Sequence, residues 1–255
     1  DWPGAAARVM QQAVKGAVVK KADPEITYEP GVELDLALTK AAEFPEKFDE
    51  PRIASIEPAG ELERLVNAQP FQTTAEKPPK PSDITNLMYI GSNESVARAF
   101  EAAGWATAEQ LSAKSGIETV AAVAENRGYK EAPMSILLLD GKPPEMVFQK
   151  QLNTFAERHH LRIFKRPDKF RGLDVWVCAA THDTGISFSP ENRTFIHLID
   201  HQIDRERAKV VTDLVFTGLV KGLALVDRPA VPKSGMNATG DKIETDGNMA
   251  VVMVE

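Results

Sequence analysis

In the first part of the chain, the spacing of apolar residues predicts one helix and one strand, followed by a Pro-rich segment. Apolar side chains recur at helical spacing over residues 5–19, and residues 32–38 alternate apolar with polar or small side chains. These patterns predict a short amphipathic helix followed by a strand with one buried face. The segment 70–83 contains four prolines and almost no apolar periodicity. It is therefore predicted to be a linker or an extended strap.

The rest of the chain has the pattern of a compact domain. Asp140-Gly141 joins two predicted strands within 135–149, and Thr107 with Gln110 predicts a capped helix. Further helices are predicted after residue 91 and from 204 to 218. Other short apolar runs predict strands at 86–90, 160–164, 175–180, 194–199, 222–227 and 249–254. Turns too short for crossover helices favour an α+β fold with an antiparallel or mixed sheet packed with helices.

Domain organisation and composition narrow the class of protein. We assign a helix and β segment to residues 1–69, a Pro-rich linker to 70–82 and the α+β domain to 83–255. No apolar run is long enough for a membrane helix, and the single cysteine excludes an internal disulfide framework. A net charge of -7 argues against nucleic-acid binding. The chain starts at Asp1 rather than methionine, which indicates a processed or truncated product.

All five histidines lie between residues 159 and 201. In a strand, Arg158, His160 and Arg162 share one face, whereas His159 shares the other face with apolar neighbours. We therefore expect His159 to be buried and bonded to a backbone carbonyl, with a ligand or catalytic role as the alternative. The Arg-His-Arg row is expected to face a groove or solvent, either as a solvated cationic face or as an anion site.

Other titratable residues carry two interpretations each. His182 and Asp183 end an apolar strand, where Asp183 is equally good turn chemistry. Asp204 and Glu206 are explained by helix capping. Candidate metal ligands are Asp183, Asp200 and Asp241, so a divalent ion stays open as a cofactor, although Asp246-Gly247 by itself predicts a hairpin turn.

The chain carries, in this order, the motifs NLMYIGS, AAGW, VFQK, RHHLRIF, VWVCAATHDTGI, HLIDHQIDRER and NATGDKIETDG. This ordered set resembles the LssY carboxy-terminal-domain family over about 83–255. Phe164 stands where many members have tryptophan. His201 stands where proline is usual, which argues against His201 as an essential ligand. The resemblance implies a bacterial protein of the periplasm, the envelope or a secretion system, because members are sometimes joined to membrane phosphatase-like domains, but it implies no reaction.

Three functions remain open. The favoured one is an envelope module that binds an anionic small molecule, a lipid headgroup or an envelope protein, because no known catalytic spacing is satisfied. The second is a phosphoester hydrolase, in which an aspartate orients an imidazole or holds a metal and arginines stabilise phosphate. The third is a purely structural component. The candidate catalytic residues are His159, His160, His182 and His197, and the candidate ligand contacts are Arg158, Arg162, Arg207 and Asn237. Convergence of His160, Arg162, His197 and Asp241 would favour the enzyme.

Overall fold

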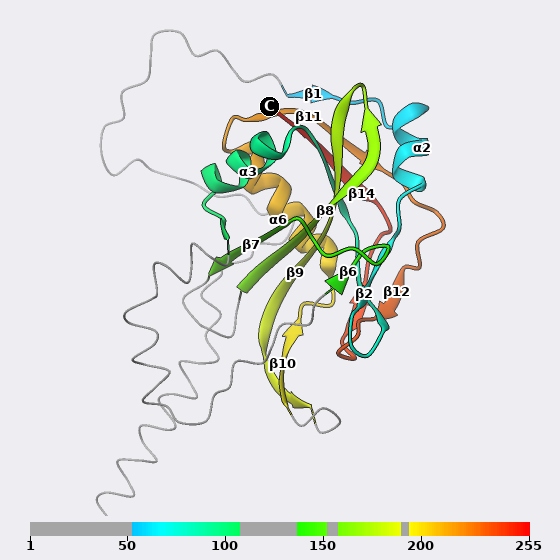
Figure 1. Ribbon diagram of the computed structural model, residues 1–255, viewed down its shortest axis with the longest axis vertical. Helices are drawn as coiled ribbons and strands as arrows, with labels where there is room; N and C mark the ends of the chain where they lie inside the picture. Colours follow the sequence, from blue (N-terminus) through cyan, green and yellow to red (C-terminus); the bar gives the residue numbers. More distant parts are fainter. Residues whose placement is uncertain (1–52, 108–136, 152–157, 190–193) are drawn as a thin grey trace, which may run out of the picture. The chain divides into compact units, whose positions relative to one another are not determined.

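The computed structural model describes residues 53–107, 137–151, 158–189 and 194–255 (Figure 1). These residues belong to one compact unit that begins at Pro51. The elements expected at 5–19 and 32–38, and the helix expected after Thr107, lie outside the described residues.

A nine-stranded mixed sheet forms the centre of this unit. Its order is β1-β11-β14-β4-β9-β8-β7-β5, and β10 pairs with β9. The β1–β11 and β14–β4 pairs are parallel, and the other pairs are antiparallel. The strands are β1 (Ala54–Ser55), β4 (Leu87–Ile90), β5 (Ala106–Thr107), β7 (Met146–Gln151), β8 (Arg158–Phe170), β9 (Leu173–Ser189), β10 (Thr194–Ile199), β11 (Val220–Val226) and β14 (Met249–Val254). The predicted α+β class and mixed sheet are confirmed.

Two small sheets flank the central one. The strands β2 (Gln72–Ala75), β3 (Lys80–Ile84) and β6 (Leu137–Leu138) form one of them, in the order β3-β2-β6. The second sheet pairs β12 (Ser234–Met236) with β13 (Lys242–Glu244). The segment predicted to be a linker or an extended strap therefore contains two strands. Pro70 precedes β2, Pro78 and Pro79 lie between β2 and β3, and Pro81 is at the start of β3, positions where fewer backbone donors are required.

Helices cover both faces of the central sheet (Figure 1). They are α2 (Glu61–Asn67), α3 (Asn93–Ala102) and α6 (Ile203–Val215). Ser92 caps α3, because its hydroxyl accepts a hydrogen bond from the Ser95 amide at 3.1 Å. Apolar residues of α3 and α6 pack into one core cluster, and those of α2 pack into the cluster on the opposite face.

The alternation of side chains along β4 supplies both clusters. Leu87 and Tyr89 enter the α3/α6 side, whereas Met88 and Ile90 enter the α2 side. All four are fully buried, as expected for a central strand covered on both faces. Gly91 follows β4, and a β-carbon there would lie 2.7 Å from the carbonyl oxygen of Val254. This close approach requires glycine.

The two predicted Asp-Gly turns form, but the strands beside them have other main partners. At Asp140-Gly141 the residues on either side, Leu139 and Lys142, form an antiparallel bridge, while β6 pairs with β2 and β7 pairs with β8. Asp246-Gly247 does form a turn, yet β13 and β14 belong to different sheets. In both cases the local turn signal is correct and tertiary packing decides the partner. Within the described ranges, no helix has the length and apolar character needed to cross a membrane.

Candidate functional site

The β8–β9 ladder organises the histidine-rich segment. His159 lies opposite His182, and His160 lies opposite Thr181. Because facing residues of an antiparallel pair point to the same side, the ladder carries two separate polar clusters. One lies on the α6 side of the sheet and the other lies on the side of β3.

On the β3 side, His160 forms a close pair with Asp183. The His160 Nε2 and Asp183 Oδ2 atoms are 2.8 Å apart, and both residues are 4% exposed. An imidazole that gives its Nε2 proton to a carboxylate keeps a lone pair on Nδ1. The Nδ1 atom of His160 is buried and has no hydrogen-bond partner among the described residues. The pair therefore has the form of a carboxylate-oriented base.

Arg162 extends the same cluster toward β3. Its Nη1 atom lies 3.3 Å from Asp83 Oδ2, and the Ser82 hydroxyl donates to Asp83 Oδ1 at 3.2 Å. Burial raises the pKa of Asp83, and the nearby Asp183 charge adds to this effect. Arg162, Ser82 and His160 act in the opposite direction without cancelling it. Asp83 thus keeps its proton to a higher pH than an exposed aspartate.

The row Arg158, His160 and Arg162 was expected to face a groove or solvent. The alternation of faces is confirmed, but His160 is buried and the two arginines are half-buried. The strands of the small β2-β3-β6 sheet supply cover and a carboxylate that the local sequence pattern does not reveal. A solvated cationic face is therefore wrong for this row.

On the α6 side, His159 is buried as expected, but its partner is a carboxylate rather than a backbone carbonyl. The His159 Nδ1 atom lies 2.8 Å from Glu206 Oε2, and the side chains are 1% and 3% exposed. The His182 ring stacks on His159 with centroids 4.5 Å apart and planes 20° apart. Trp105 meets His159 edge-on at 6.0 Å. Glu206 is therefore more than a residue that complements the helix dipole.

Asp200, Asp241 and Asn237 lie apart from these two clusters, and His197 is described only in its backbone. The backbone of His197 pairs with Ile186 in the β9–β10 ladder, and its side chain lies outside the described residues. Asp200 Oδ1 accepts a hydrogen bond from the Gln202 amide at 2.9 Å and shapes the entry to α6. Asp241 accepts from the Thr239 hydroxyl at 2.9 Å within a closed turn.

Asn237 belongs to the same turn, since its Oδ1 accepts from the Asp241 amide at 2.8 Å. The turn approaches the β3 cluster only at its edge, where the Ala238 amide lies 3.5 Å from the Ser82 hydroxyl. In the part of the chain that the structure describes, no three His, Cys, Asp or Glu side chains gather into a metal site. The predicted set Asp183, Asp200 and Asp241 therefore does not converge there.

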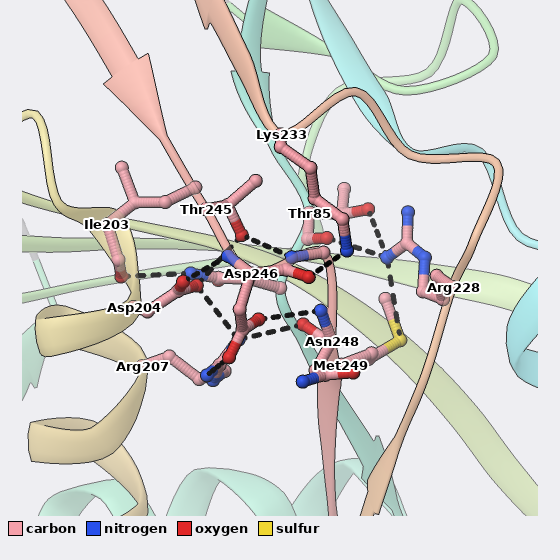
Figure 2. A network of polar contacts seen from close by, with 12 residues as sticks. Thr85, Ile203, Asp204, Arg207, Arg228, Lys233, Thr245, Asp246, Asn248 and Met249 are labelled. Carbon is pink, nitrogen blue, oxygen red and sulfur yellow. Dashed lines mark hydrogen bonds and ion pairs between the residues drawn. The ribbon is translucent and has the colours of Figure 1, made fainter.

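Arg207, a predicted ligand contact, instead holds the start of α6 to the turn before β14 (Figure 2). Its guanidinium makes two contacts with Asp246, at 2.7 and 2.8 Å, and a third with Asp204 at 2.8 Å. Asp204 also accepts from the Thr245 hydroxyl and the Asp246 amide. The hydrogen bond from Arg207 lowers the pKa of Asp246 to about 2. This network accounts for Asp204 and Arg207 as structural residues.

Sequence reasoning missed Asp83 and Ser82, because both stand at the end of a Pro-rich stretch without periodicity. The local signal available was a polar pair two residues before the strand predicted at 86–90. It missed the role of Glu206 because an acidic residue in a first helical turn already has an explanation.

Comparison with known proteins supports the resemblance drawn from the motifs. A family model described as LssY C-terminus matches residues 64–249. The chain belongs to the LssY C-terminus family. The match begins within α2, so in this LssY C-terminus domain the β2-β3 segment lies inside the matched region. No curated protein and no solved structure matches the chain.

The LssY C-terminus motifs contribute to different parts of the structure. RHHLRIF and THD supply the two histidine clusters, while the DRER segment supplies both Glu206 and Arg207. Motif residues from β8, β9 and α6 therefore contact one another. They form two clusters, one around His159 and Glu206 on the α6 side of the sheet and one around His160 and Asp183 on the β3 side.

Proposed function

We propose that this LssY C-terminus domain is a phosphoester hydrolase in which His160 is the acid–base residue. The contact between His160 Nε2 and Asp183 Oδ2 carries the proposal. It places the proton on Nε2 and leaves Nδ1 as a base without a hydrogen-bond partner in the described part of the protein. Burial strengthens this polarisation, because water screens the pair poorly.

The arginines on either side of His160 suit a phosphoryl group. Arg158 and Arg162 precede and follow His160 by two residues, so both guanidinium groups start from the same face of β8. A planar guanidinium can donate two hydrogen bonds to phosphate and offset charge that grows on its oxygens. Arg162 is also the more exposed member of its pair, with 15% of its side chain accessible against 8% for Asp83.

Asp83 supplies a proton donor for the leaving group. Its raised pKa, caused chiefly by burial, favours the protonated acid. In the proposed step a water gives a proton to His160 Nδ1 as its oxygen attacks phosphorus. The bond from phosphorus to the ester oxygen breaks, and that oxygen takes the proton of Asp83. His160 and Asp83 are both buried in this conformation. Entry of a substrate therefore requires a movement of the residues that cover them.

A simple anion-binding surface, favoured from the sequence, fits the geometry less well. A binding surface alone gives no role to the buried contact of His160 with Asp183 or to that of Arg162 with Asp83. In the hydrolase these same carboxylates have roles. The location in the bacterial periplasm, envelope or exterior stays a prediction from the family resemblance.

The test is turnover of p-nitrophenyl phosphate and bis(p-nitrophenyl) phosphate by wild type and by His160→Gln. Glutamine keeps a donor for Asp183 and removes the titratable base. We expect wild-type turnover and a loss of about 10²–10⁴-fold in kcat for the variant. His201→Gln is the matched control, because the His201 side chain is 53% exposed.

Two outcomes would overturn the proposal. If wild type turns over neither ester, with or without added divalent ions, the proposed hydrolase activity is refuted. Equal kcat in wild type and His160→Gln, with only the melting temperature lowered, assigns the pair to structure alone, since ion-pair networks also perturb buried groups.

A further inference from the structure

Arg228 is a buried cation in the loop between β11 and β12. The residue is 2% exposed. Its Nη1 donates to the Thr85 carbonyl oxygen at 2.7 Å and lies 3.4 Å from the Thr85 hydroxyl (Figure 2). The third neighbour is the Met249 sulfur at 3.9 Å. All three neighbours are neutral.

Arg228 has no counter-charge in the described part of the molecule. No carboxylate there lies within ion-pair distance of its guanidinium, and Nη2 is buried without a hydrogen-bond partner. Burial alone lowers the pKa of Arg228 to about 10, with no acidic neighbour acting against it. Desolvating a charge without a partner costs several kcal/mol in general.

Arg207 shows how this chain treats a buried guanidinium that serves structure. It is 8% exposed, comparable with Arg228, and it is held by Asp204 and Asp246. Although burial lowers the pKa of Arg207, hydrogen bonding to Asp246 and the two negative charges raise it overall. The two arginines appear together in Figure 2, where Arg207 contacts Asp204 and Asp246, whereas Arg228 has no carboxylate partner among the described residues. Arg228 therefore has the donor and the charge of an anion site.

We propose that Arg228 binds an oxyanion of the phosphate class through Nη2. A water molecule could satisfy the hydrogen bond, but it would not neutralise the charge. The same loop carries a second cation, Lys233, which is exposed and donates to the Asp246 carbonyl. Pro229 and Ala230 next to Arg228 are exposed, so a local displacement of this loop gives an ion a path from solvent. Planar guanidinium groups favour tetrahedral oxyanions over chloride.

The test compares thermal unfolding of the full chain in sodium phosphate and in sodium chloride of matched ionic strength. Phosphate should raise the wild-type Tm saturably, by about 3 °C at ten times its dissociation constant, whereas chloride should not. Arg228→Met should abolish the phosphate shift and, in phosphate-free buffer, should melt no lower than wild type because an unpaired buried charge is gone. Arg64→Met, at an exposed position of α2, is the control for loss of one charge and should keep the shift.

Two further variants separate the alternatives. Arg228→Lys keeps the charge without the two-point geometry and should weaken the affinity for phosphate about tenfold. This variant provides the comparison if Arg228→Met does not fold. His160→Gln should keep the full shift, and this separates the site from the proposed hydrolase. A phosphate shift equal to that of chloride, or one that survives in Arg228→Met, would overturn the proposal.

Discussion

His159 and His160 are neighbours in β8, yet each bonds a carboxylate on a different face of the sheet. His159 meets Glu206 of α6, and His160 meets Asp183 of β9, both at 2.8 Å. Strand alternation turns the two rings in opposite directions, and each reaches the carboxylate available on its side. A dipeptide that looks like one site in the sequence therefore belongs to two.

Breaking the buried pair on the α6 side should destabilise the protein strongly. Either His159→Ala or Glu206→Ala should lower the free energy of unfolding by about 3–5 kcal/mol, because the remaining group stays buried without its partner. Urea unfolding followed by circular dichroism measures this loss. The double variant His159→Leu/Glu206→Leu should lose clearly less than the sum of the two single losses. Wild-type stability of His159→Ala would contradict the pairing.

Asp246 should make the protein more sensitive to acid. Its folded pKa of about 2 lies below the ordinary 3.8, chiefly through the hydrogen bond from Arg207. The lowered pKa means that the contribution is present above pH 4 and is lost as the pH falls toward 2. Because the Asp246 side chain is 43% exposed, we expect only about 1 kcal/mol.

The measurement for Asp246 is the free energy of unfolding from pH 5 down to pH 2, in wild type and in Asp246→Asn. The free energy of unfolding of the variant should be lower than that of wild type at pH 5, and this difference should disappear as the pH falls. Glu57→Gln removes one exposed negative charge and is the control. A difference in the free energy of unfolding that stays constant across this range would show that Arg207 does not lower the pKa of Asp246.

Asp83 should change the free energy of unfolding with pH in the opposite direction to Asp246. Burial raises its folded pKa above 3.8, so its stabilising protonated form is present at low pH and is lost as the pH rises through the folded value. Relative to Asp83→Asn, wild type should therefore become less stable from about pH 4 upward. Chemical unfolding of both proteins between pH 4 and pH 8 tests this, and a parallel pair of curves would refute the raised pKa.

The strand and helix pattern of the main domain could be predicted from local sequence, whereas the partners of its polar residues could not. The helix at 204–218 and the strand at 249–254 depend on apolar spacing, which is local information, and α6 and β14 appear there. Asp83 and Arg162 are far apart in the chain, and only the addition of the β2-β3-β6 sheet brings them together. No pattern around either residue encodes that contact.

The two strands of the Pro-rich segment follow from the same physics. Proline in series argues against a central strand, but it is compatible with the edge of a small sheet, and among the described strands β3 pairs only with β2. The candidate site was therefore predicted in its histidines and in Asp183, and missed in its other acids. His159, His160, His182 and Asp183 were identified, while Glu206 was assigned to capping and Asp83 was not considered.

Cys178 provides an independent measure of how tightly the centre of the sheet is held. It is fully buried in β9, and burial, together with a minor effect of the Glu206 charge, raises the pKa of its thiol to about 12. In the native protein it should react with a disulfide reagent at least about 10³-fold more slowly than in urea, because reaction requires opening of the core. The chain has one cysteine, so a single thiol should appear on unfolding.

Labelling of Cys178 should also respond to the pair on the α6 side. If opening equilibrates faster than labelling, the rate follows the free energy of unfolding, and a loss of about 3 kcal/mol in Glu206→Ala should accelerate it about 150-fold. His201→Gln should leave the rate unchanged, since that ring is outside the core. Rapid native labelling of wild type would contradict a sealed core. An unchanged rate in Glu206→Ala would instead show that the core opens at Cys178 without breaking the contact between β8 and α6.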